Sequence, residues 1–280
     1  MSIWSKPSRI EPLTQAQHSL QVAWRGLSLP SRCAVIASLM LAVMVLLDQP
    51  VLALSNSLDP SIRTLLYNVT KLGNSAWSLL ITLALIATGA AAARLACKRK
   101  RVALTRLRGA ALYLFVTVAI SGFLASLSKH MIGRARPSSM EAPEALIFEP
   151  MLFRAAYSSF PSGHATTSIA LATGLGALFP RHRTAFMVIG IWIAASRALI
   201  GVHWFSDVIA GAALGWVTAW LLKHWFARRG IAFRKPVARP VPTPRRFLGT
   251  LRRTGQWMLA DADGEGSAPL TETRHRSDPA

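Results

Sequence analysis

The chain has 280 residues, of which 52% are hydrophobic and only 16% are charged, and its mean hydropathy is +0.35. Soluble domains carry about 25% charged residues, so this composition excludes an ordinary soluble protein. The formal net charge of +20 arises from 32 Lys and Arg against 12 Asp and Glu. The chain lacks a polar domain with basic stripes and interleaved aromatic residues, so we predict a membrane partner and no nucleic acid.

Six hydrophobic segments are long enough to cross a bilayer as helices, which takes about 17–25 residues. They lie at about 33–54, 75–93, 109–128, 163–180, 184–201 and 204–222. The first is interrupted late by the polar trio Asp48-Gln49-Pro50, which we expect near the far interface. The predicted fold class is therefore all-α, a polytopic membrane protein with six transmembrane helices.

Lys and Arg fix the predicted orientation, because they accumulate in cytoplasmic loops. The segment 94–108 carries seven of them and no acidic residue, which places it in the cytoplasm. We then expect both termini in the cytoplasm of a bacterial inner membrane, and segments 55–74 and 129–160 on the periplasmic side. No secretory signal precedes the first hydrophobic run, in keeping with a cytoplasmic start.

The predicted domains are a cytoplasmic N-terminal segment (1–32), a six-span domain (33–227) and a basic, disordered cytoplasmic tail (228–280). The tail is rich in Pro and Arg. It fits either docking on anionic lipid at the cytoplasmic face or simple solvation.

Polar residues inside or beside the spans gather at the predicted outer interface, where charged groups are costly and usually functional. They are Lys129, Arg136-Pro137, Pro161-Ser162-Gly163-His164, Ser196-Arg197, His203 and Asp207. Six separate chain positions thus converge on one side, which indicates a single shared site.

Three members of this group, Lys129, Arg136 and Arg197, are cations, and together they favour the binding of an anion. Phosphate suits them, since Arg binds phosphate oxygens as a fork and Lys acts as a point charge. Ser162 and Gly163 begin a predicted helix, whose free N–H groups and positive dipole end favour an anion as well. Glycine at this point lets the backbone approach the ligand.

His203 and Asp207 are four residues apart, so on a helix they share a face and the carboxylate can accept the imidazole N–H. The other ring nitrogen of His203 is then free to attack, while His164, from another helix, can protonate a leaving oxygen. A nucleophile oriented by a third group, with a separate acid, is sufficient for covalent phosphoryl transfer. We expect no metal and no cofactor.

At these residues the chain resembles the type-2 phosphatidic acid phosphatase and haloperoxidase superfamily. Its three-part signature corresponds to Lys129-x6-Arg136-Pro137, Pro161-Ser162-Gly163-His164 and Ser196-Arg197-x5-His203-x3-Asp207. The motifs and the spans around them cover about residues 109–222, and six spans fit the integral-membrane lipid phosphatase branch better than the soluble haloperoxidases.

The resemblance implies a role for each residue. His203 becomes phosphohistidine, Asp207 orients it, and His164 protonates the leaving group and then activates water. Five residues hold the phosphoryl oxygens: Lys129, Arg136, Ser162, Gly163 and Arg197. Pro137, Pro161 and Ser196 support the motifs.

We therefore predict a metal-independent membrane lipid phosphatase. The resemblance implies phosphatidylglycerophosphate, phosphatidic acid, undecaprenyl diphosphate or lipid A 1-phosphate as substrate, and the sequence does not choose among them. A lipid phosphotransferase with the same residues and, from a different class, a transporter of an anionic substrate are the alternatives. The sequence leaves the oligomeric state open, since Gly211 and Gly215 fit either a dimer face or packing within the bundle.

Overall fold

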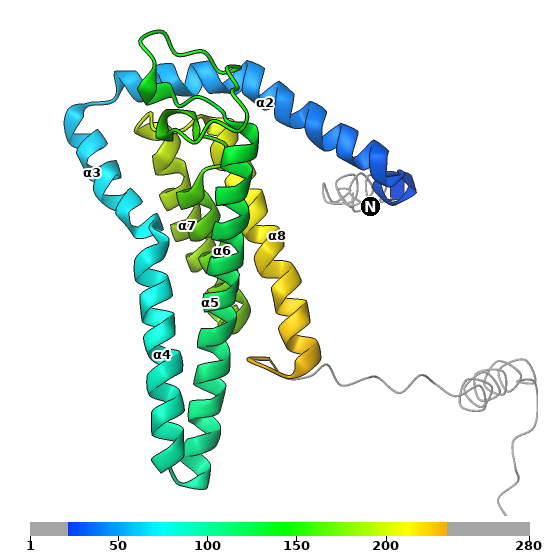
Figure 1. Cartoon of the computed structure of the whole chain (residues 1–280), viewed down its shortest axis with the longest axis vertical. Helices are drawn as coiled ribbons and strands as arrows, with labels where there is room; N and C mark the ends of the chain where they lie inside the picture. The colour runs from blue at the N-terminus through cyan, green and yellow to red at the C-terminus, as the bar shows by residue number, and fades with distance from the viewer. Residues whose placement is uncertain (1–21, 234–280) are drawn as a thin grey trace, which may run out of the picture. The chain divides into compact units, whose positions relative to one another are not determined.

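The computed structural model describes residues 22–233. Within them the chain is helical apart from loops and one isolated β-bridge, between Arg134 and Phe148, which confirms the all-α prediction. The helices, shown in Figure 1, are α2 (Leu29–Ser57), α3 (Pro60–Thr70), α4 (Ser75–Leu95), α5 (Lys98–Ile132), α6 (Gly163–Leu178), α7 (Arg183–Leu199) and α8 (Phe205–Arg229). Single turns of 3-10 helix occur at Lys71–Gly73, Pro137–Ser139, Ala155–Tyr157 and Pro180–His182.

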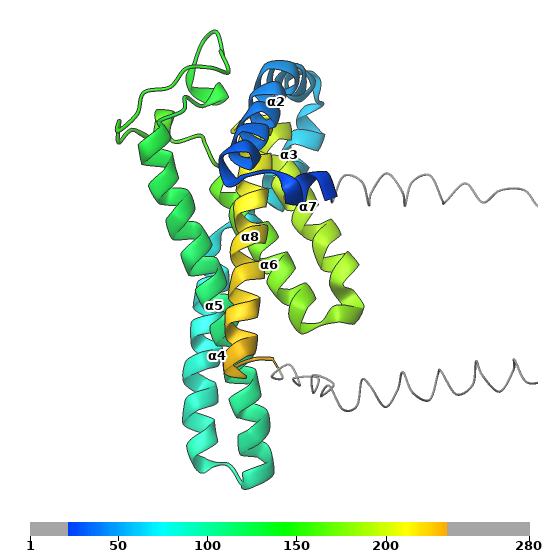
Figure 2. The same cartoon turned by 90° about the vertical axis from the view of Figure 1, so that its right-hand side faces the viewer.

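Helix α6 is the centre of the bundle. It packs against α5, α7 and α8, and nine of its 16 residues are buried. Helices α4 and α5 form a long antiparallel hairpin, while α2 runs at a slant past one end of the bundle and contacts α7 and α8 (Figures 1 and 2). A helix that is buried on most sides needs few charged residues, and α6 has none apart from its first-turn histidine.

Two glycines let α8 approach α6 closely. A Cβ on Gly211 would collide with the carbonyl oxygen of Ser162, and one on Gly215 would collide with that of Thr166. Any side chain at these positions would push the two helices apart. The GxxxG pattern therefore serves packing inside the bundle.

Several helices are long enough to cross a membrane, which confirms a multi-pass membrane protein. Within residues 22–233, four helical stretches qualify by length and composition: Leu29–Ser57, Pro60–Leu95, Lys98–Ile132 and Phe205–Arg229. Helices α6 and α7 have only 16 and 17 residues. Sixteen residues span about 24 Å, less than the roughly 30 Å of a hydrocarbon core, so these two do not qualify alone.

Some predicted boundaries differ from the observed ones. The basic segment 94–108 is mostly helix, because α5 begins at Lys98 and only two residues separate it from α4. Lys, Arg, Leu and Ala are strong helix formers, so a helix can extend beyond the apolar run. The predicted outer segment 55–74 contains α3, which starts with Asp59 accepting the Ser61 N–H and Pro60 at the first helical position. The basic tail beyond residue 233 lies outside the described residues.

The loop from Gly133 to Ser162 is anchored by backbone hydrogen bonds. Gly133 ends α5 in a left-handed conformation (φ 62°), where a Cβ would collide with the Glu149 carbonyl oxygen. The N–H of Ala135 donates to Ile147 O at 3.0 Å, and that of Arg136 donates to Ala156 O at 2.8 Å. The short stretch 134–136 is thereby fixed in place, and it carries two arginines of the site described next.

Candidate active site

Four helix ends meet on one side of the bundle. Helix α5 ends there, α6 and α8 begin there, and α7 ends there (Figures 1 and 2). The beginnings of α6 and α8 are joined directly, because the Ser162 N–H donates to the Asp207 carbonyl oxygen at 3.0 Å. The motifs that lie far apart in the sequence thus reach the same end of the fold, as predicted.

His203 lies in the turn before α8, beside Asp207 and Ser159. Its Nδ1 is 3.6 Å from Asp207 Oδ2 and 3.3 Å from Ser159 Oγ, and the Ser159 hydroxyl donates to the same Oδ2. The Trp204 N–H donates to Oδ2 as well, at 3.0 Å. With a proton on Nδ1, the ring can donate to Ser159 Oγ, and the Ser159 hydroxyl in turn donates to the Asp207 carboxylate. The other ring nitrogen, Nε2, then keeps its lone pair.

The electrostatic surroundings keep the His203 ring neutral. Burial lowers its pKa to about 4, the nearby Asp207 raises it, and the positive charges of Lys129 and Arg197 lower it further. A neutral imidazole at pH 7 is the form that can act as a nucleophile.

Within residues 22–233, the three predicted phosphate-binding cations make few side-chain hydrogen bonds. An Arg136 Nη2–H donates to the Ser158 carbonyl oxygen at 3.3 Å, and an Arg197 Nη1–H donates to Thr70 Oγ1 at 3.3 Å. Burial lowers the pKa of Arg136, and the negative charge of Asp207 raises it. Both guanidinium groups remain charged, because arginine does not lose its proton in proteins.

Unpaired polar atoms concentrate at this site. In the described part of the chain, six buried side-chain polar atoms have no hydrogen-bond partner, and three belong to predicted site residues: Arg136 Nε, Ser162 Oγ and Arg197 Nε. Buried polar groups in native proteins are almost always paired, so such orphans require an explanation. A bound anion would supply acceptors for all three.

A cavity of about 220 Å³ opens beside the start of α6. Lys129, Gly163 and His164 line it, together with Gly73–Ser75 and the α5 residues Gly122, Ala125 and Ser126. A Cβ on Gly163 would lie 3.6 Å from Lys129 Nζ, so the lysine is close to the start of α6. The predicted acid and one predicted cation therefore face open space, whereas His203 and Asp207 are buried.

The predicted supporting residues have structural roles. Pro137 and Pro161 are buried in the loop that carries Arg136 and Ser162. The Ser196 hydroxyl is also buried and donates to the Ile193 carbonyl oxygen at 2.7 Å, within its own helix. Ser196 thus contacts its own helix backbone, while its neighbour Arg197 takes part in the site.

Four buried polar residues of the site were not predicted from the sequence. They are Asp48, Arg134, Ser159 and Ser206. Asp48 is 1% exposed and pairs with Arg134 at 2.7 Å, so this member of the polar trio is buried inside the protein at the end of the bundle that holds the site. A carboxylate in a hydrophobic run implies a buried cation as partner, and this signal was available in the sequence.

The charges of the site leave room for a dianion. Asp48 balances Arg134, so Asp207 is the remaining carboxylate beside the three predicted cations. The excess of two positive charges matches a phosphate monoester, which carries about −1.5 to −2 at pH 7.

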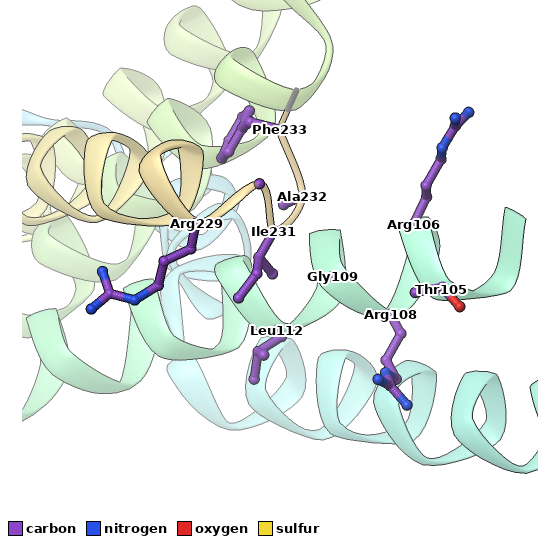
Figure 3. A pocket seen from close by; sticks show the side chains of 10 residues that line it. Thr105, Arg106, Arg108, Gly109, Leu112, Arg229, Ile231, Ala232 and Phe233 are labelled. Carbon is purple, nitrogen blue, oxygen red and sulfur yellow. The ribbon is translucent and has the colours of Figure 1, made fainter. Parts of the chain in front are cut away.

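The opposite end of the bundle has a larger cavity, of about 730 Å³, between α5, the end of α8 and residues 230–233. Three arginines line it, but Figure 3 shows Arg106, Arg108 and Arg229 pointing away from one another. The Arg229 guanidinium stacks on Trp225, 3.6 Å from the ring centre. These arginines do not form a common anion site.

Comparison with known proteins agrees with this geometry. The family model described as PAP2 superfamily matches residues 110–231. The chain is 38% identical over 192 residues to the lipid A 1-phosphatase of Rhizobium etli, covering 68% of this chain and 82% of that protein. The chain belongs to the PAP2 superfamily, and the prediction of a membrane phosphatase is confirmed at that level.

Two further similarities are more distant. The lipid A 4'-phosphatase of Bacteroides thetaiotaomicron is 34% identical over 121 residues, which is 42% of this chain and 52% of that protein. The crystal structure of a transmembrane PAP2 type phosphatidylglycerolphosphate phosphatase from Bacillus subtilis matches with a TM-score of 0.48 and 21% identity, over 69% of this chain and 94% of that one.

Proposed function

We propose that this protein removes the 1-phosphate of lipid A at the outer face of a bacterial inner membrane. The choice of lipid A among the predicted lipid phosphates rests on the similarity to the Rhizobium etli enzyme, which extends over 82% of that protein. The reaction class rests on one observation of the site. Buried, unpartnered donors of Arg136, Ser162 and Arg197 lie where the cations exceed the carboxylates.

His203 attacks the phosphorus through Nε2, while Ser159 and Asp207 hold the proton on Nδ1. The phosphorus–oxygen bond to the sugar breaks and the phosphoryl group passes to His203. Lys129, Arg136 and Arg197 hold the phosphoryl oxygens, which carry most of the charge in such a transfer. The Ser162 hydroxyl and the start of α6 at Gly163 add donors.

His164 acts at the other side of the phosphorus. It lines the open cavity, so it can protonate the leaving sugar oxygen there. A water molecule then takes the place of the sugar, and its oxygen attacks the phosphorus while His164 accepts its proton. The bond between phosphorus and His203 Nε2 breaks, and inorganic phosphate is released. Since the side-chain cations supply the positive charge, we propose that no metal takes part.

The proposed topology has six spans, with α6 and α7 crossing as short helices inside the bundle, both termini in the cytoplasm and the site toward the periplasm. The catalytic domain is 33–227, and anionic lipid at the cytoplasmic face remains a proposed partner of the basic tail. The family assignment argues against the alternative of an anion transporter.

The test is phosphate release by purified protein in detergent and EDTA, from lipid A, phosphatidylglycerophosphate, phosphatidic acid and undecaprenyl diphosphate. We expect fastest release from lipid A, with loss of one phosphate from the glucosamine 1-position by mass spectrometry. His203→Ala should lower kcat by at least about 10⁴-fold. His224→Ala, at an exposed histidine of α8, is the matched control and should turn over normally.

Other results would contradict specific parts of the proposal. Faster release from another lipid overturns the substrate, and loss of release in EDTA overturns metal independence. Transfer of the phosphoryl group to a second lipid, without free phosphate, identifies the phosphotransferase. Equal activity of His203→Ala and the parent overturns the mechanism.

A further inference from the structure

A buried ionic network connects the first long helix to the proposed nucleophile. The Arg134 side chain is fully buried between two carboxylates. Its Nη2 lies 2.7 Å from Asp48 Oδ2 on α2, and its Nη1 lies 2.6 Å from Asp207 Oδ1 on α8. Neither Arg134 nor Asp48 is one of the specified residues of the family signature, although Arg134 lies between Lys129 and Arg136.

The remaining contacts of Arg134 fix its orientation. Its Nε and Nη2 donate to the Ala145 carbonyl oxygen at 2.9 and 2.6 Å. The guanidinium carbon lies 5.4 Å from the ring centre of Trp204 and 5.7 Å from that of Phe148. A planar group held by donors in its plane and by rings beside it cannot rotate freely.

Asp48 is fixed just as firmly. Its Oδ1 accepts the Ser206 N–H at 2.8 Å, and its Oδ2 accepts the Ser206 hydroxyl at 2.6 Å. That serine also accepts from Arg134 Nη1, at 2.6 Å. Asp48, Arg134 and Ser206 are therefore all hydrogen-bonded to one another, and Arg134 connects this network to Asp207.

The two oxygens of Asp207 have different partners. Oδ1 accepts from Arg134, whereas Oδ2 faces Ser159, the Trp204 N–H and His203 Nδ1. A carboxylate held at one oxygen has no freedom to rotate, so the other oxygen stays directed at the imidazole. Orientation by an outer partner is a general way of tuning a reactive histidine.

The charge of Asp48 matters as well as its geometry. An arginine paired with Asp207 alone would neutralise the carboxylate that has to stabilise the positive charge developing on His203. Because Asp48 takes up the charge of Arg134, Asp207 keeps its negative potential at the ring. The network thus both orients Asp207 and compensates the charge of Arg134.

We propose that Arg134 and Asp48 are positioning residues of the nucleophile, holding Asp207 by Oδ1 so that Oδ2 orients and stabilises His203. This inference rests on the proposed function, in which His203 is the nucleophile. Neither residue is assigned to the phosphate-binding group, so the network should affect turnover and leave substrate binding unchanged.

The experiment compares the parent with Asp48→Asn, Arg134→Lys, Arg134→Met and Ser206→Ala, using steady-state kinetics on the best lipid substrate. Asp48→Asn keeps the shape and one acceptor but removes the charge, and should lower kcat about 10- to 100-fold with KM within about twofold. Arg134→Lys should keep more activity than Arg134→Met, since it retains a charged donor. Ser206→Ala leaves both ion pairs intact and should give the same change in kcat on a smaller scale.

Two controls separate positioning from loss of structure. Inhibition by inorganic phosphate depends on the cations that bind the product, so each correctly folded variant should keep the inhibition constant of the parent. Ser55→Ala is the matched control, because Ser55 and Asp48 are the two buried residues of α2 and the Ser55 hydroxyl has no partner in the described part of the chain. It should leave kcat unchanged.

The inference is overturned if Asp48→Asn and Ser206→Ala lower only the unfolding temperature, or if they raise KM and leave kcat unchanged. Equal activities of Arg134→Lys and Arg134→Met would also overturn it. An inactive parent, or a His203→Ala variant as active as the parent, would instead refute the proposed function itself.

Discussion

Arginines occur at both ends of this bundle, in opposite circumstances. At the end where α6 and α8 begin, Arg134 is fully buried and Arg197 is 9% exposed. At the other end, Arg106, Arg108 and Arg229 are exposed and point in different directions (Figure 3). A count of cations and the size of the cavity would both favour the second end as the anion site, because it has more Lys and Arg and the larger cavity.

The difference lies in desolvation and convergence. An exposed guanidinium is hydrated and screened, so it gains little from a partner. A buried guanidinium with an unpaired Nε, such as that of Arg197, gains much more when an anion binds to it. The number of cations at each end therefore says less about catalysis than their burial does.

The largest effect that tests this comparison is expected for Arg197→Gln. Loss of one buried donor to the phosphoryl oxygens should lower kcat/KM about 10²- to 10³-fold, because the charge in the transition state loses a preorganised partner. Initial rates on the preferred lipid phosphate provide the measurement. Arg154→Gln removes an exposed charge from the loop on the same side and is the control, expected to stay near the parent. Equal losses in both variants would show that overall charge, and not the buried donor, matters.

Much of the site was predictable because the motifs fix the spacing of their residues. His203 and Asp207 do lie side by side, but His203 is in the turn before α8 and only Asp207 is in the helix, so the two do not share a helix face; Ser162 and His164 lie at the start of α6. The prediction of one common end also holds, since helices that alternate in direction bring every second loop to the same side. The catalytic roles stay predictions until the variants are measured.

The part that could not be predicted depends on contacts between distant segments. Asp48 and Arg134 are 86 positions apart, and the pattern of neither segment identifies the other as partner. Ser159 lies in a loop whose path has no periodicity to read. Helix α3 and the extension of α5 to Lys98 were missed for another reason, because a hydropathy scan detects long apolar runs and does not detect helices of mixed composition.

The second comparison of the two ends concerns histidines and pH. Burial lowers the pKa of His203 to about 4 from an ordinary 6.5. The unfolded chain therefore binds a proton at His203 more readily than the folded protein does. The stability that the neutral His203 ring contributes is complete above about pH 6.5 and is lost as the pH falls from 6.5 toward 4. We expect His203→Gln to have a flatter dependence of unfolding temperature on pH between 7 and 4 than the parent.

Thermal unfolding in detergent across that window provides the measurement. The control is His224→Gln, since that ring is exposed near the other end of α8 and should leave the pH curve unchanged. Parallel curves for His203→Gln and the parent would mean that His203 is not held neutral in a buried site.

The smallest effect is expected at the arginine-rich end. The triple variant Arg106→Gln, Arg108→Gln and Arg229→Gln removes three exposed charges around the 730 Å³ cavity. Their predicted role is to fix the orientation of the chain during insertion, not to bind substrate. Exposed substitutions away from special features usually change free energies by no more than about 0.5 kcal/mol, so kcat/KM of correctly inserted protein should stay within about twofold of the parent. A loss as large as that of Arg197→Gln would show that the far cavity acts on the catalytic end through the shared helices α5 and α8, and the contrast between exposed and buried arginines would then no longer explain function.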